Sequence, residues 1–141
     1  MLKFFLIFFI IPFFAFAEQK VITPDDLDSF GWEYVGQDVY VVALLHDTYG
    51  CRQPSNKGSV CTNVYYDGKL YDDIIFHKSF KSDDIKPLLS KCLAFIGRVE
   101  DRDITTQGNL TSYPALIVSN FKILDDIYCD VANKVWLWKN Y

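Results

Sequence analysis

The side chains in this sequence that could carry chemistry are four cysteines, two histidines and a set of tyrosines. Cysteine thiolates and histidine rings bind zinc, but zinc sites need short C-x-x-C or cysteine–histidine spacings. An even number of cysteines in an exported chain indicates disulfides instead. We therefore predict two disulfides, with neither a metal site nor a cofactor. The four cysteines, none of which has a zinc-type spacing, are Cys51, Cys61, Cys92 and Cys129.

Four cysteines allow three pairings, and the stretch 49–60 favours one of them. This stretch is rich in Gly, Pro, Ser and Asn, which is typical of a connection between two strands. Cys51 and Cys61 bracket it, so they should meet once the flanking strands pair. Cys92 follows a short predicted helix and would then hold the tail at Cys129. The predicted disulfides are Cys51–Cys61 and Cys92–Cys129.

No pattern in the sequence points to catalysis. His46 and His77 stand at the ends of predicted strands, and the sequence names no partner for either. A serine-nucleophile motif, a phosphate-binding loop and an H-E-x-x-H pattern are all missing, and the acidic doublets lack calcium-loop spacing. Arg98 and Glu100 share the outer face of one strand, where a solvated ion pair is expected. The sequence therefore predicts that the protein is not an enzyme.

Tyr65, Tyr66 and Tyr71 are the candidate binding residues. They flank Asp67-Gly68, which is a strong hairpin signal. Tyr65 and Tyr66 are successive and point to opposite faces of a strand, so at least one of them should lie outside the core. An exposed tyrosine offers a partner a flat, amphipathic contact. The predicted contact surface combines these tyrosines with Arg52 and the polar stretches 52–59 and 105–112. The alternative is that the tyrosines only cover the outside of the domain and bind no partner.

The N-terminus, MLKFFLIFFIIPFFAFAEQK, has the pattern of a secretory signal peptide. Lys3 precedes a long apolar run, and Ala15-Phe16-Ala17 is a cleavage site of the A-x-A type. An uncleaved membrane anchor is the alternative, but the run is short for a span. We expect residues 1–17 to be removed and residues 18–141 to form one domain in the periplasm or outside the cell. Asn109-Leu110-Thr111 would be a glycosylation acceptor only in a eukaryotic host.

Caps, alternation and turn signals predict the elements that position these residues. Thr23 is a strong helix start, and Gly31 is expected to end that helix after two turns at most. Residues 93–99 alternate as a half-buried strand does. Ser82 could cap a short helix, which Pro87 would disturb. The predicted strands are residues 39–47, 61–66, 69–77, 93–101 and 113–125, and a tail with Val131, Val135, Trp136 and Trp138 forms a sixth strand or an extended segment.

Three short stretches resemble small exported bacterial OB-fold proteins. They read VGQDV at residues 35–39, IGRV at 96–99 and PALIV at 114–118. The resemblance covers roughly residues 23–125. It implies a mainly β fold with short helices: an OB-fold-like five-stranded Greek-key barrel, an N-terminal helix, and a helix between strands three and four. It also implies that a partner would bind the barrel face and rim loops around the tyrosines.

The net charge limits the kind of partner. With Lys3 removed, 13 basic residues face 18 acidic ones, a net charge of −5. Such a domain is a poor candidate for binding the phosphates of a nucleic acid. We therefore expect an exported, non-catalytic binding module for a protein or glycan partner. Two alternatives stay open: a secreted or periplasmic nuclease-like OB-fold enzyme, and an inhibitor or subunit of an envelope assembly.

Overall fold

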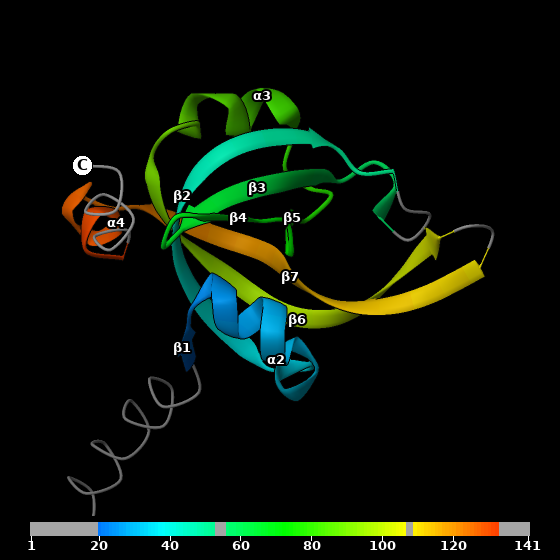
Figure 1. Ribbon diagram of the computed structural model, residues 1–141. Helices are drawn as coiled ribbons and strands as arrows, with labels where there is room; N and C mark the ends of the chain where they lie inside the picture. Colours follow the sequence, from blue (N-terminus) through cyan, green and yellow to red (C-terminus); the bar gives the residue numbers. More distant parts are fainter. Residues whose placement is uncertain (1–19, 53–55, 107–108, 133–141) are drawn as a thin grey trace, which may run out of the picture.

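The computed structural model of the protein describes residues 20–52, 56–106 and 109–132 (Figure 1). The predicted signal peptide and the tail residues Val135, Trp136 and Trp138 lie outside these ranges. Strands dominate and the helices are short, so the predicted mainly β class is confirmed. In chain order the elements are β1 (Lys20–Ile22), α2 (Pro24–Tyr34), β2 (Asp38–Gly50), β3 (Val60–Tyr66), β4 (Lys69–Tyr71), β5 (Ile74–Phe76), α3 (Ser82–Ile85), the 3-10 helix η2 (Lys86–Leu88), β6 (Cys92–Thr106), β7 (Asn109–Ile123) and α4 (Ile127–Ala132).

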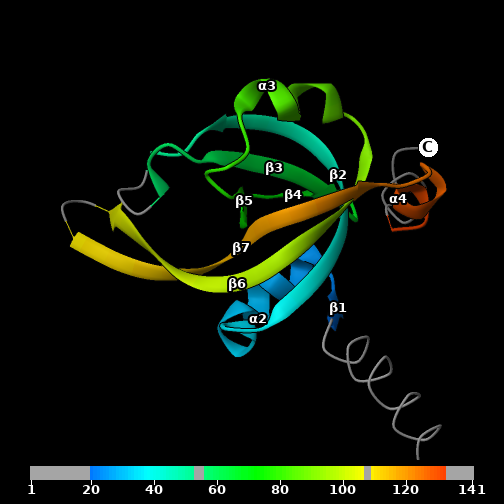
Figure 2. The same ribbon diagram turned by 180° about the vertical axis from the view of Figure 1, so that it is seen from behind.

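Five of the strands close into a ring (Figures 1 and 2). β2 pairs with β6, β6 with β7, β7 with β5 and β5 with β3, and β3 pairs again with β2. Neighbours in the ring are antiparallel except β5 and β7, which are parallel. β1 lies parallel to β2, and β4 lies antiparallel to β3, both beside the ring. The ring gives its strands a shared inner face.

The main core lies inside this ring. Along β2 every second residue from Val39 to Leu45 is fully buried, as the alternation of a strand requires. These residues join one cluster with Phe76 of β5 and Phe95 of β6. The two phenylalanine rings meet edge to face with their centroids 6.0 Å apart, a geometry that stabilises aromatic pairs. β2 pairs with β1, β3 and β6, so the predicted strand 39–47 is not an edge strand.

Helix α2 begins where the sequence predicts and ends later. The Thr23 hydroxyl accepts a hydrogen bond from the Asp26 N–H at 3.0 Å, and the Asp26 carboxylate accepts one from the Thr23 N–H at 3.1 Å. The expected stop at Gly31 is wrong, because the helix continues to Tyr34 through a kink at Phe30. Gly31 is needed for packing, since a Cβ there would lie 2.6 Å from Cγ of Pro114.

Helix α3 lies on the opposite side of the ring from α2 (Figures 1 and 2). Its N-cap is Lys81 and not the predicted Ser82, because the Lys81 N–H donates to the Asp84 carboxylate at 3.2 Å. Pro87 falls in the 3-10 turn that continues α3, as the loss of its N–H would suggest. Within the described ranges no helix reaches the length and hydrophobicity of a membrane span.

Two predicted strand boundaries are wrong. The expected strand 69–77 is divided at Asp72 and Asp73: β4 continues the hairpin with β3, whereas β5 pairs with both β3 and β7. The expected polar loop 105–112 belongs largely to a long hairpin, because β6 and β7 stay paired as far as Thr106 and Asn109. Strand β1 and helix α4 were not predicted. Both extra elements flank the ring without changing its order.

Candidate binding surface

The two disulfides have the predicted pairing. Cys51 is bonded to Cys61, and Cys92 to Cys129. The first closes the connection between β2 and β3, and the second ties helix α4 to the beginning of β6. Two disulfides are typical of proteins that fold outside the reducing cytosol.

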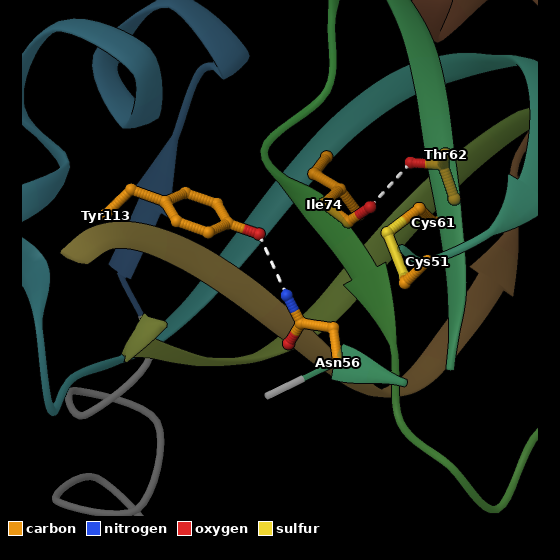
Figure 3. Close-up of a disulfide and its surroundings, with 6 residues drawn as sticks. All are labelled: Cys51, Asn56, Cys61, Thr62, Ile74 and Tyr113. Carbon is orange, nitrogen blue, oxygen red and sulfur yellow. Dashed lines mark hydrogen bonds between the residues drawn. A yellow bond between two sulfur atoms is a disulfide. The ribbon is translucent and has the colours of Figure 1, made fainter. Parts of the chain in front are cut away.

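The loop closed by Cys51 and Cys61 is fastened to the long hairpin of β6 and β7. The side-chain amide of Asn56 donates a hydrogen bond to the Tyr113 hydroxyl oxygen at 3.0 Å, and Asn56 is only 1% exposed (Figure 3). The Ser59 N–H donates to the Asn56 carbonyl, and the Cys51 N–H donates to the Ser59 carbonyl. The disulfide packs in a small second core with Ile75, Ala115 and Ile117. Asn56, Ser59 and the disulfide are therefore held against the hairpin and the second core.

The predicted binding residues do not form one surface. Tyr71 is 7% exposed and belongs to the main core, and its hydroxyl donates to the Asp25 carboxylate at 3.2 Å. Tyr66 is half-buried and packs against the same core. Tyr65 points the other way and meets the His46 ring edge to face, with centroids 4.6 Å apart. Arg52 is exposed on the disulfide loop. Tyr71 is therefore not available to a partner, because the hairpin turns its ring inward.

Two other tyrosines lie near the Cys51–Cys61 disulfide, and sequence reasoning missed them. Tyr49 is paired with Cys61 across β2 and β3, and Tyr113 packs against the cluster that contains the disulfide. Burial raises the pKa of Tyr49, and the carboxylates of Asp72, Asp47 and Asp73 raise it further. Burial also raises the pKa of Tyr113, the Asn56 hydrogen bond lowers it, and Asp73, Asp72 and Tyr49 raise it. These residues come from the end of β2, the link between β4 and β5, and β7. We call Tyr49, Asn56, Asp72, Asp73 and Tyr113 the tyrosine face.

Asp73 is the most perturbed acid of the tyrosine face. Burial, a hydrogen bond with the Asp28 side chain and the nearby Asp72 carboxylate raise its pKa to about 7. Its Oδ2 atom is buried without a hydrogen-bond partner, while its backbone carbonyl accepts from the Leu116 N–H at 2.8 Å. The site therefore holds a carboxyl group that can carry a proton near neutral pH.

The remaining polar residues singled out by the sequence have local roles. His77 accepts a hydrogen bond from the Ser79 N–H through Nδ1 at 3.2 Å, which orients its ring at the end of β5. Arg98 and Glu100 do not pair with each other: Arg98 contacts Asp38 across the strands, and Glu100 contacts Arg102. In residues 20–52, 56–106 and 109–132, no cluster of three His, Cys, Asp or Glu side chains could hold a metal ion.

Comparisons with known proteins leave the family open. No family model matches the chain, and no curated protein does. A similar solved structure is that of a protein assigned as an aspartyl-tRNA synthetase from Leishmania major Friedlin, with 12% sequence identity and a TM-score of 0.47. The match covers 74% of this chain and 20% of that one. The chain thus spans a fifth of the length of this similar protein, at a level of similarity that carries no conclusion on function.

Proposed function

We propose that this protein is an exported OB-fold module that binds a protein or glycan partner and catalyses no reaction. The OB-fold assignment is supported by the five-strand ring with its single parallel contact, by α2 before the ring and by α3 between β5 and β6. It agrees with the resemblance to small exported bacterial OB-fold proteins. Export to the periplasm or the medium is supported by the signal-like N-terminus and the two disulfides.

The observation that carries the binding role is the tyrosine face. Tyr49 is 39% exposed at the end of β2, next to the disulfide loop. Asn56 uses the Tyr113 oxygen as an acceptor, so the phenol hydrogen can be donated to a further acceptor. A partner would meet side chains that are already held, which lowers the entropy cost of binding.

The chemistry of the tyrosine face limits its partner. Tyrosine rings bury large flat areas at low entropic cost, and carboxylates accept hydrogen bonds from sugar hydroxyls or from basic side chains. Asp72 is exposed beside the two tyrosines. A phosphate-rich partner is disfavoured because both its charge and that of this face are negative. Proteins and glycans are the two classes that fit.

The test compares two tyrosines at different positions along the paired strands β2 and β3. The disulfide-bonded protein is screened on a glycan array and by cross-linking to proteins of the cell envelope and medium. Each binder found is measured again with Tyr49→Ala and with the matched control Tyr65→Ala. We expect Tyr49→Ala to weaken binding at least tenfold, and Tyr65→Ala to leave it within twofold, while both variants keep the native circular dichroism.

Two results would contradict the proposal. Binding that depends on Tyr65 and not on Tyr49 would place the contact around Tyr65 and His46. A protein that captures neither a glycan nor a protein in these screens would not be a binding module of the proposed kind.

A further inference from the structure

Helix α2 is fastened to the ring along one side. Leu27 is buried in the main core, and Tyr34 packs against that core from the last turn of the helix. Between them Gly31 approaches β7 so closely that a Cβ there would lie 2.6 Å from Cγ of Pro114. The three residues are four and three positions apart, which places them on the same side of the helix. The outer side of α2 is therefore carried on a firmly packed element.

The outer side of α2 exposes large apolar side chains. Phe30 is 54% exposed and Trp32 is 56% exposed, although Gly31 between them is buried, and Val35 at the C-cap is exposed as well. Residues of this kind are mostly buried in folded domains, and several of them close together mark an interaction site. The other described helices lie on other sides of the ring in both views, so they leave this side of α2 uncovered (Figures 1 and 2).

The charged side chains of α2 are all acidic: Asp25, Asp26, Asp28 and Glu33. They give the helix a net charge of −4, against −5 for residues 18–141 as a whole. Asp25 accepts a hydrogen bond from the Tyr71 hydroxyl and Asp26 one from the Thr23 N–H, and these neutral donors cancel none of the charge. Asp28 and Glu33 are exposed to solvent. Lys20 of β1, which lies over the Tyr34 ring, offsets only part of this charge.

We propose that the outer side of α2 is a docking surface for a basic amphipathic helix of a partner protein. We call its exposed residues Asp28, Phe30, Trp32, Glu33 and Val35 the helix face. Apolar side chains of the partner would cover Phe30 and Trp32, and its lysines or arginines would lie beside Asp28 and Glu33. A cation can also bind over the indole ring of Trp32. This inference goes beyond the proposed function, because the helix face shares no residue with the tyrosine face.

Charge and shape select this occupant over the others. A second copy of the chain would bring the acids of two α2 helices together, and an anionic membrane or a nucleic acid would be repelled in the same way. A neutral glycan would leave the negative charge of the helix without a counter-charge. The helix has 11 residues and forms a ridge about 16 Å long, along which a second helix can pack.

The experiment titrates the disulfide-bonded protein with three synthetic peptides of equal length. The first is a helix of leucine and lysine with its leucines on one side. The second has glutamate in place of lysine, and the third has the composition of the first in an order that destroys the apolar side. We expect the first peptide to bind at least ~tenfold more tightly than either control, and salt to weaken its binding.

A pair of aromatic substitutions tests the position of the contact. Trp32→Ala removes the central ring of the helix face, and the matched control Tyr128→Ala removes a ring that is 59% exposed on α4. We expect Trp32→Ala to weaken binding of the leucine–lysine peptide at least ~tenfold and Tyr128→Ala to leave it within twofold. Amide chemical shifts of the wild-type protein locate the peptide without any substitution, so the test still decides if Trp32→Ala does not fold.

A pair of charge substitutions tests the electrostatic part. Asp28→Asn with Glu33→Gln removes two charges from the helix face, whereas Asp83→Asn with Asp125→Asn removes two exposed charges from other parts of the domain. Exposed ion pairs contribute modestly, so we expect the first double variant to bind the leucine–lysine peptide about fivefold more weakly. The second should stay within twofold of the wild type.

Several results would overturn the proposal. They are equal binding of the three peptides, wild-type affinity of Trp32→Ala, and chemical-shift changes that lie outside α2. Self-association that Trp32→Ala abolishes would assign this side of α2 to a second copy, and a glycan that requires Trp32 would assign it to a glycan. Tyr49→Ala should leave the affinity for the leucine–lysine peptide within twofold, so a failure here is distinct from a failure of the tyrosine face.

Discussion

Replacement of Gly97 by alanine tests whether β6 and β7 are packed as described. Gly97 lies in β6 at the position where its register with β7 shifts, opposite Val118 and, on the other side, Val39. A Cβ at this position would overlap the Ile117 carbonyl oxygen and would lie 2.8 Å from the carbonyl carbon and 3.1 Å from Cα of Val118. The new methyl group would therefore collide with the backbone, not with a side chain that could turn aside.

The expected loss of stability is large because β7 cannot retreat. It is paired with β6 on one side and with β5 on the other, so a shift would break hydrogen bonds on both. Overpacking typically costs about 1–3 kcal/mol where side chains can adjust. We expect Gly97→Ala to reach or exceed the upper end of that range, about 3 kcal/mol, which lowers Tm by roughly 10 °C. Urea and thermal unfolding of the disulfide-bonded protein measure both.

Gly50→Ala is the matched control. Gly50 also lies in a strand, at the end of β2, and a Cβ there would meet nothing within 4 Å. Its replacement should change stability by less than about 1 kcal/mol and can increase it by restricting the unfolded chain. A Gly97→Ala protein within 1 kcal/mol of both the wild type and Gly50→Ala would refute the close approach of β6 to the Ile117 backbone.

Two further predictions concern the helix cap and the disulfides. Thr23→Ala should lower the free energy of unfolding by about 1 kcal/mol because it removes the acceptor for the Asp26 N–H. Thr23→Ser keeps a hydroxyl acceptor and should retain most of the wild-type stability, so equal unfolding midpoints for the two variants would argue against the cap. Replacing Cys92 and Cys129 by Ser should lower the free energy of unfolding by about 4 kcal/mol, because the bonded residues are 37 positions apart. Replacing Cys51 and Cys61 by Ser should lower it by about 3 kcal/mol, because these residues are only 10 positions apart. If urea unfolding showed the larger loss for the Cys51–Cys61 bond, the loop-closure reasoning would be contradicted.

The sequence by itself determined the features that depend on neighbouring residues. Thr23 caps a helix because its hydroxyl and the Asp26 carboxylate are one turn apart. A loop rich in Gly, Pro, Ser and Asn with a cysteine near each end specifies the Cys51–Cys61 bond. With only two cysteines left, the second bond followed. Such patterns lie within a few residues, so a linear reading is enough to find them.

Only the tertiary structure decided which distant residues meet. β5 is short, and its pairing with β7 as well as β3 ends the predicted strand 69–77 at Asp72 and Asp73. That division carries Asp73 to Asp28 and to the side of Tyr49 and Tyr113, while it leaves Tyr71 turned into the core. The spacing of these residues along the chain does not indicate which of them meet, because ring closure joins strands that lie far apart in sequence. The candidate site is thus set by strand pairing, and the local patterns specify only the elements that are paired.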